Sequence, residues 1–109
     1  MKVDINDIFD SYDLFGREYK ITENIHAKYP EISENELQNI MDQLKEIYDF
    51  CTGYGQVIAD KYKMPFLPKT DEAVLDINEY LGICKEKYPE INDDKILGIF
   101  STVCWLSNR

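Results

Sequence analysis

The pentapeptide Lys-Tyr-Pro-Glu-Ile occurs twice in this chain, at residues 28–32 and again at residues 87–91. The similarity continues downstream, because apolar residues that follow the first copy coincide with apolar residues that follow the second at the same offset of 59 positions. The matched pairs are Leu37 and Ile96, Ile40 and Ile99, Met41 and Phe100, Leu44 and Val103, and Ile47 and Leu106. Their spacing is typical of a helix with one buried face. The repeat therefore predicts two helical hairpins.

Each copy also carries the signals that end one helix and begin the next. Tyr29 and Tyr88 both precede a proline, which disfavours the α conformation in the residue before it. Ser33 and Asn92 then stand where an N-cap is needed, and both residue types suit that position. Ser33 and Glu36 together match the Ser-x-x-Glu capping box. These two helix starts are structural signals and assign no activity.

Helical spacing of apolar residues predicts five helices in total. They are expected over residues 4–15, 17–28, 34–63, 70–88 and 92–107. The longest keeps its apolar phase through Gly53 and Gly55, and a break at Thr52-Gly53 is the alternative. No segment alternates as a strand does.

The chain of 109 residues has the size of one domain. The predicted fold is an all-α, single-domain bundle of about five helices, built largely from two αα-hairpins. Its first half is expected at residues 4–63, a loop at residues 64–69 and the second hairpin at residues 70–107.

The charge is strongly acidic and unevenly distributed. The net charge is −9; residues 1–50 hold 12 acids against 5 bases, whereas residues 51–109 hold 9 against 7. Such a surface repels phosphate, so we expect no direct binding to nucleic acid. It favours a basic protein partner, such as the nucleic-acid groove of another protein. The alternative is that the acidity only keeps a small domain soluble.

The sequence holds no apolar run near the roughly 20 residues of a membrane span. Its first residues carry acids where a secretion signal has an apolar stretch. From these patterns we expect a cytoplasmic protein that does not bind membranes.

Residues suited to catalysis or metal binding are few. His26 is the single histidine, and the three cysteines, Cys51, Cys84 and Cys104, lack metal-ligand spacing. We expect these cysteines to be reduced core residues, with a contact between Cys84 and Cys104 left open. No nucleophile motif or phosphate loop occurs. The expectation is therefore a non-catalytic protein without cofactor or metal.

The leading functional hypothesis is an acidic protein-binding module, acting as an inhibitor, immunity or regulatory protein. It would present carboxylates on the first and third predicted helices to a basic partner, with an aromatic residue adding affinity. The expected partner-binding residues are Asp4, Asp7, Asp10, Tyr12, Asp13, Glu34, Glu36, Asp42, Glu46 and Asp49.

Two alternatives remain. In the first, the chain is a homo-oligomeric assembly protein, most simply a homodimer, that associates through its apolar last helix, with Leu97, Cys104 and Trp105 as the contact face. In the second, a small ligand or substrate occupies a pocket between helices near His26 and the glycines at positions 53 and 55.

Overall fold

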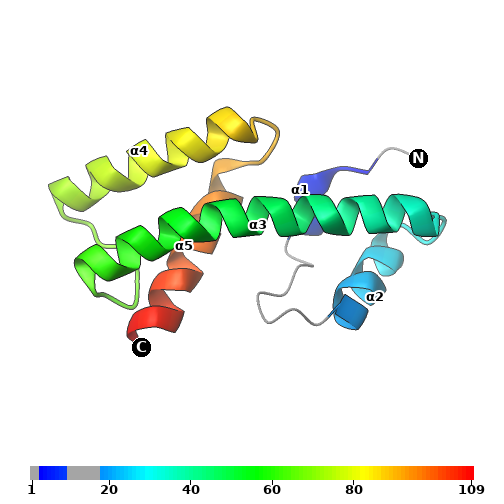
Figure 1. Ribbon diagram of the computed structural model, residues 1–109, viewed down its shortest axis with the longest axis horizontal. Helices are drawn as coiled ribbons and strands as arrows, with labels where there is room; N and C mark the ends of the chain where they lie inside the picture. Colours follow the sequence, from blue (N-terminus) through cyan, green and yellow to red (C-terminus); the bar gives the residue numbers. More distant parts are fainter. Residues whose placement is uncertain (1–2, 10–17) are drawn as a thin grey trace. The chain divides into compact units, whose positions relative to one another are not determined.

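The computed structural model describes residues 3–9 and 18–109, and five helices lie within these ranges (Figure 1). They are α1 (Ile5–Ile8), α2 (Glu18–Lys28), α3 (Glu34–Tyr62), α4 (Asp71–Lys87) and α5 (Asp93–Asn108). The described residues contain no strand, which confirms the all-α class.

The last four helices begin and end within one residue of their predicted bounds. The first predicted helix, over residues 4–15, is described only as far as residue 9, and α1 is its described part. Asp4 is the N-cap of α1, and its carboxylate accepts a hydrogen bond of 3.0 Å from the backbone N–H of Asn6.

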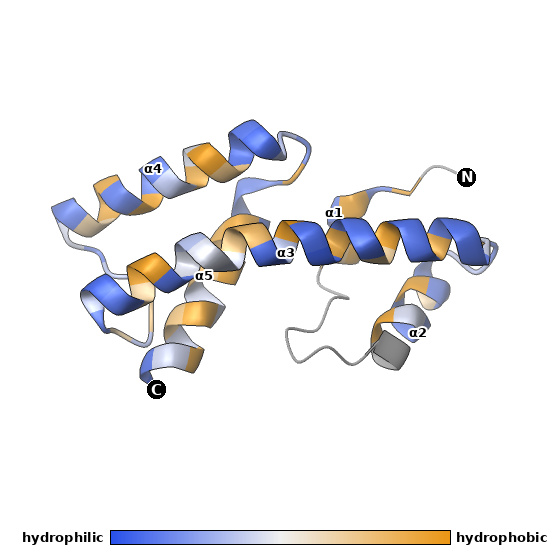
Figure 2. Ribbon diagram, viewed as in Figure 1, coloured by the Kyte–Doolittle hydropathy of each residue, from blue (hydrophilic) through white to orange (hydrophobic). Residues whose placement is uncertain are grey.

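Helix α3 is continuous through Gly53 and Gly55, so the alternative of a break at Thr52-Gly53 is wrong. Figure 2 shows hydrophobic residues recurring along its length, as expected for a helix that buries one face. The helix ends at Tyr62, and the next residue, Lys63, has a positive φ of 54°, the left-handed conformation common after helices.

The two Tyr-Pro turns share the same backbone hydrogen bonds. In the first, the Ile32 N–H donates to the Tyr29 carbonyl at 3.1 Å; in the second, Ile91 donates to Tyr88, also at 3.1 Å. The pentapeptide thus makes the same backbone hydrogen bond at both places. Whether the whole hairpins repeat remains a prediction.

Side chains close the two turns differently. The capping box forms at the start of α3, because the Glu36 N–H donates to Ser33 Oγ at 3.2 Å and Ser33 Oγ donates to the Glu36 carboxylate at 3.2 Å. Asn92 occupies the N-cap position of α5, but its side chain makes no capping hydrogen bond, contrary to expectation. Instead, Lys85 donates to the Ile91 carbonyl and pairs with Asp93 at 3.3 Å.

The chain divides into two compact units, with the boundary inside α3. We call residues 1–48 the N-terminal unit and residues 49–109 the C-terminal unit. In the N-terminal unit, the Phe9 and Tyr48 rings stack at 4.8 Å, and the buried Tyr48 hydroxyl donates to the Phe9 carbonyl at 3.0 Å. Ile8, Ile25 and Leu44 are completely buried in this unit.

In the C-terminal unit, α4 runs antiparallel to the second half of α3. Ring pairs connect them, with centroids 5.7 Å apart for Phe50 and Tyr88 and 5.3 Å apart for Tyr54 and Tyr80. The first turn of α4 buries Ala73, whereas the neighbouring Val74 is 44% exposed.

Helix α5 approaches α3 closely at Gly55. A Cβ at this position would lie 3.2 Å from Val103 Cβ and 3.3 Å from Phe100 Cα, whereas a Cβ at Gly53 would meet nothing within 4 Å. At the end of α5, the Asn108 amide donates to the Ala59 carbonyl of α3 at 3.0 Å. Gly55 therefore permits a helix contact that a side chain would obstruct.

The two glycines of α3 should respond oppositely to alanine. We expect Gly53→Ala to stabilise the protein by about 0.5–1 kcal/mol, because glycine costs entropy inside a helix. We expect Gly55→Ala to destabilise it by about 1 kcal/mol, because the Phe100 backbone must move away. Urea unfolding of both variants checks this. Equal gains in stability would contradict the close approach of α5 at Gly55.

Candidate functional site

The candidate site is a polar face on the first half of α3. Its carboxylates are Glu34, Asp42 and Glu46, all of them exposed, and we call these three residues the acidic face. Between them lie exposed amide residues, and the Gln38 amide donates to Asp42 at 3.0 Å. Lys45 is the one base on this stretch of α3. No lysine or arginine in the described ranges forms an ion pair with any residue of the acidic face.

The other two predicted acids on α3 differ from these three. Glu36 is half-buried and belongs to the capping box. Asp49 is exposed, but it belongs to the C-terminal unit. The structure therefore groups three of the five predicted α3 acids as an open surface of one unit.

Asp4 and Asp7 are exposed but fasten α1 to the first Tyr-Pro turn. The Tyr29 hydroxyl accepts a hydrogen bond from the Asp4 N–H at 3.3 Å and donates to the Asp7 carboxylate at 3.2 Å. Lys28 Nζ donates to the Asp7 carbonyl. Their role in the local structure was not expected from the sequence.

The remaining predicted N-terminal site residues, Asp10, Tyr12 and Asp13, lie outside the described residues.

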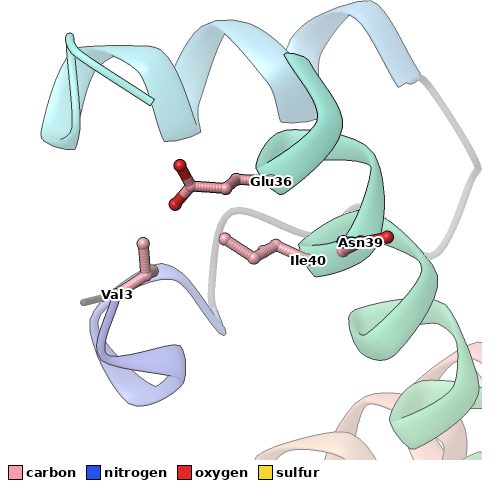
Figure 3. Close-up of a pocket in the computed structure, with 4 residues that line it drawn as sticks. All are labelled: Val3, Glu36, Asn39 and Ile40. Carbon is pink, nitrogen blue, oxygen red and sulfur yellow. The ribbon is translucent and has the colours of Figure 1, made fainter. Parts of the chain in front are cut away.

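An open hollow of about 220 Å³ adjoins the start of α3 (Figure 3). It is lined by Val3, Glu36, Asn39 and Ile40, and Figure 3 shows the Glu36 and Ile40 side chains facing Val3. Two apolar side chains, one amide and one carboxylate provide no pairing of nucleophile and base. Within the described ranges, no three His, Cys, Asp or Glu side chains are grouped so that they could hold a metal ion.

The positions of His26 and of the two glycines do not support the predicted ligand pocket. His26 is exposed on α2 and does not line the hollow. The space beside Gly55 is filled by Val103 and Phe100 of α5. The glycine therefore serves helix packing.

The predicted face on α5 is only partly a surface. Trp105 is 51% exposed, and the Arg109 guanidinium lies over its ring at 4.9 Å. Leu97 is half-buried, and Cys104 is 1% exposed. The Cys104 side chain is therefore a core group and forms no part of an exposed face.

All three cysteines are buried and reduced, as expected, but the contact is between Cys51 and Cys84. The contact between Cys84 and Cys104, which the sequence left open, is not the one that forms. The Cys51 thiol donates to the Cys84 sulfur, which lowers the pKa of Cys84 and raises that of Cys51. Burial raises the pKa of Cys104. Both cysteines can be read from the sequence, but the register of α3 against α4 that brings them together cannot.

A charged cluster joins the C-terminal end of α3 to α4. Lys61 Nζ lies 2.8 Å from Asp76 and 3.1 Å from Glu72, and the Tyr62 hydroxyl donates to Asp76 at 2.6 Å. Hydrogen bonds from Lys61 and Tyr62 lower the pKa of the Asp76 carboxyl. Burial and the hydrogen bond to Asp76 raise the pKa of Tyr62. Every charge in the cluster has a neighbour of opposite sign or a hydrogen bond. The cluster therefore serves to hold α4 against α3.

The Asp76 cluster predicts an acid-dependent stability. Because the folded-state pKa of Asp76 lies below the unfolded value of about 3.9, its contribution is present above that value and is lost as pH falls through the folded pKa. Asp76→Asn should therefore lower the unfolding midpoint in urea at pH 7, and the deficit should shrink towards pH 2.

A suitable control for this experiment is Asp60→Asn, because Asp60 is exposed, accepts a hydrogen bond from the Gln56 amide at 2.8 Å and forms no ion pair with the described residues. A deficit for Asp76→Asn that is constant across the pH range would show that the carboxylate charge is not what stabilises the contact.

No helix in the described part of the chain is both long and apolar enough to cross a membrane. Comparison with models of known protein families, with curated proteins and with solved structures found no match to this chain.

Proposed function

We propose that this chain is a non-catalytic protein-binding module that uses the acidic face of α3 to engage a basic surface on another protein, as an inhibitor, immunity or regulatory protein does. The observation that carries the proposal is the exposure of Glu34, Asp42 and Glu46, none of which forms an ion pair with a lysine or arginine of the described residues.

The ion pairs of the C-terminal unit support this proposal. There, Lys61 pairs with Glu72 and Asp76, and Lys85 pairs with Asp93. Three acids of that unit, Glu72, Asp76 and Asp93, thus form ion pairs within the fold, whereas no residue of the acidic face does. Carboxylates without internal counter-charges are available to a basic partner.

The spacing of the acidic face suits a protein surface better than an ion. At a rise of about 1.5 Å per residue, Glu34 and Glu46 lie about 18 Å apart along α3. A divalent cation needs oxygens at about 2–2.6 Å, which such a spread cannot supply. A row of carboxylates over three turns instead fits the dimensions of a basic helix or groove.

Neutralising the acidic face should weaken partner binding without unfolding the protein. For the triple variant Glu34→Gln, Asp42→Asn, Glu46→Gln we expect an affinity loss of about 10- to 100-fold, since three exposed charges contribute up to about 1 kcal/mol each. The salt dependence of binding should also become flatter. Pull-down from nuclease-treated lysate isolates the partner, and calorimetry at several salt concentrations measures the affinity.

The matched control is Glu79→Gln, Glu86→Gln, Asp94→Asn, which removes the same charge from exposed sites of α4 and α5. Asp94 lies in the first turn of α5, as Glu34 does in α3, so both variants lose one favourable helix-dipole contact. Equal binding losses in the two variants would refute the acidic face as the site, because only net charge would then matter. Capture of no basic protein by the wild type would refute the proposed function.

A second candidate function is self-association through Trp105, and the exposure of this large aromatic side chain favours it. If two copies pair through α5, light scattering during gel filtration should give a dimer mass at micromolar concentration. Trp105→Ser should then return the mass to that of a monomer. A monomeric wild type at this concentration would exclude self-association as the main role.

A further inference from the structure

Cys51 and Cys84 occupy facing positions in the antiparallel contact between α3 and α4. Phe50 of α3 contacts Tyr88 of α4, and one turn later Tyr54 contacts Tyr80. Moving forward along α3 therefore moves the contact backward along α4. Position 51 falls opposite the stretch between Tyr80 and Tyr88, where Cys84 lies.

Burial and hydrogen bonding agree with this register. Both cysteines are 0% exposed, as side chains between packed helices are. The Cys51 thiol donates a hydrogen bond to the Cys84 sulfur. Cys104, the third buried cysteine, lies on α5 and has no such bond to either.

We propose that Cys51 and Cys84 form a reversible disulfide that locks α4 onto α3, with a low-molecular-weight disulfide such as oxidised glutathione as the oxidant. A disulfide requires Cβ atoms about 3.5–4.5 Å apart. Facing cysteines on two packed helices approach this distance without a rearrangement of the backbone topology.

The exchange proceeds in two balanced steps. The Cys84 thiolate, which the Cys51 thiol stabilises, attacks one sulfur of oxidised glutathione; that S–S bond breaks, and one glutathione leaves as a thiolate that takes up a proton. The Cys51 sulfur then loses its proton and attacks Cys84 in the mixed disulfide. The second glutathione leaves. In total the protein gives up two electrons and two protons, and oxidised glutathione becomes two thiols.

Access to the sulfurs controls the rate. Because both side chains are fully buried, glutathione reaches them only when α4 opens locally from α3. Mild denaturant that favours this opening should therefore accelerate the reaction without changing its product. Once formed, the bond closes the loop between residues 51 and 84 and restrains the unfolded chain.

The test incubates purified wild-type protein with oxidised glutathione, with and without a sub-denaturing concentration of urea. We expect one intramolecular disulfide, mapped by mass spectrometry to Cys51 and Cys84, with Cys104 still a thiol. Pairing with Cys104 should be at least about tenfold rarer, because the register brings Cys51 and Cys84 together. The melting temperature should rise by about 10 °C and fall again on reduction.

Two variants make the result specific. Cys104→Ser should form the same disulfide with the same thermal shift, whereas Cys51→Ser should stop at a glutathione adduct on Cys84. The proposal is overturned if wild type retains glutathione without closing the bond, or if Cys104 pairs as often as Cys84. It is equally overturned if no disulfide forms when urea exposes the thiols.

Discussion

Proline restricts the residue before it, and this restriction, imposed at Tyr29 and Tyr88, determines where the chain turns. Tyr88 ends α4 with φ −127° and ψ 69°, outside the helical region. The carbonyls of both tyrosines then accept the N–H of the isoleucine three residues later, at 3.1 Å each. The ends of α2 and α4 and the starts of α3 and α5 follow from these two turns.

Features determined locally were accessible from the sequence. The Ser33 capping box was predicted from the Ser-x-x-Glu spacing. The apolar phase favoured a continuous α3, although a break at Thr52-Gly53 was the alternative. The exposure of Glu34 and Asp42 followed from helical phase in the same way. The sequence did not reveal that the Asn92 side chain makes no capping hydrogen bond, or that Lys85 donates to the Ile91 carbonyl in the same turn.

Contacts that depend on how two distant segments align could not be predicted from the sequence. Cys51 meets Cys84 only because α3 and α4 pack antiparallel in one particular alignment, which apolar spacing alone does not specify. The bonds that Tyr29 makes with the Asp4 backbone and the Asp7 carboxylate are similar, since they join residues more than 20 positions apart. Part of the predicted acidic surface thus contributes to the fold, while the acidic face of α3 forms no ion pair with the described residues.

Gly55 has a consequence for how this sequence can evolve. The contact with α5 leaves no room for a side chain there, whereas Gly53, two residues earlier on the same helix, faces open space. Among homologous chains that keep this helix contact, position 55 should accept little beyond glycine, while position 53 should drift towards better helix formers. The two glycines look equivalent in the sequence but are therefore under unequal selection. The residues tolerated at position 55 depend on how closely α5 packs against α3.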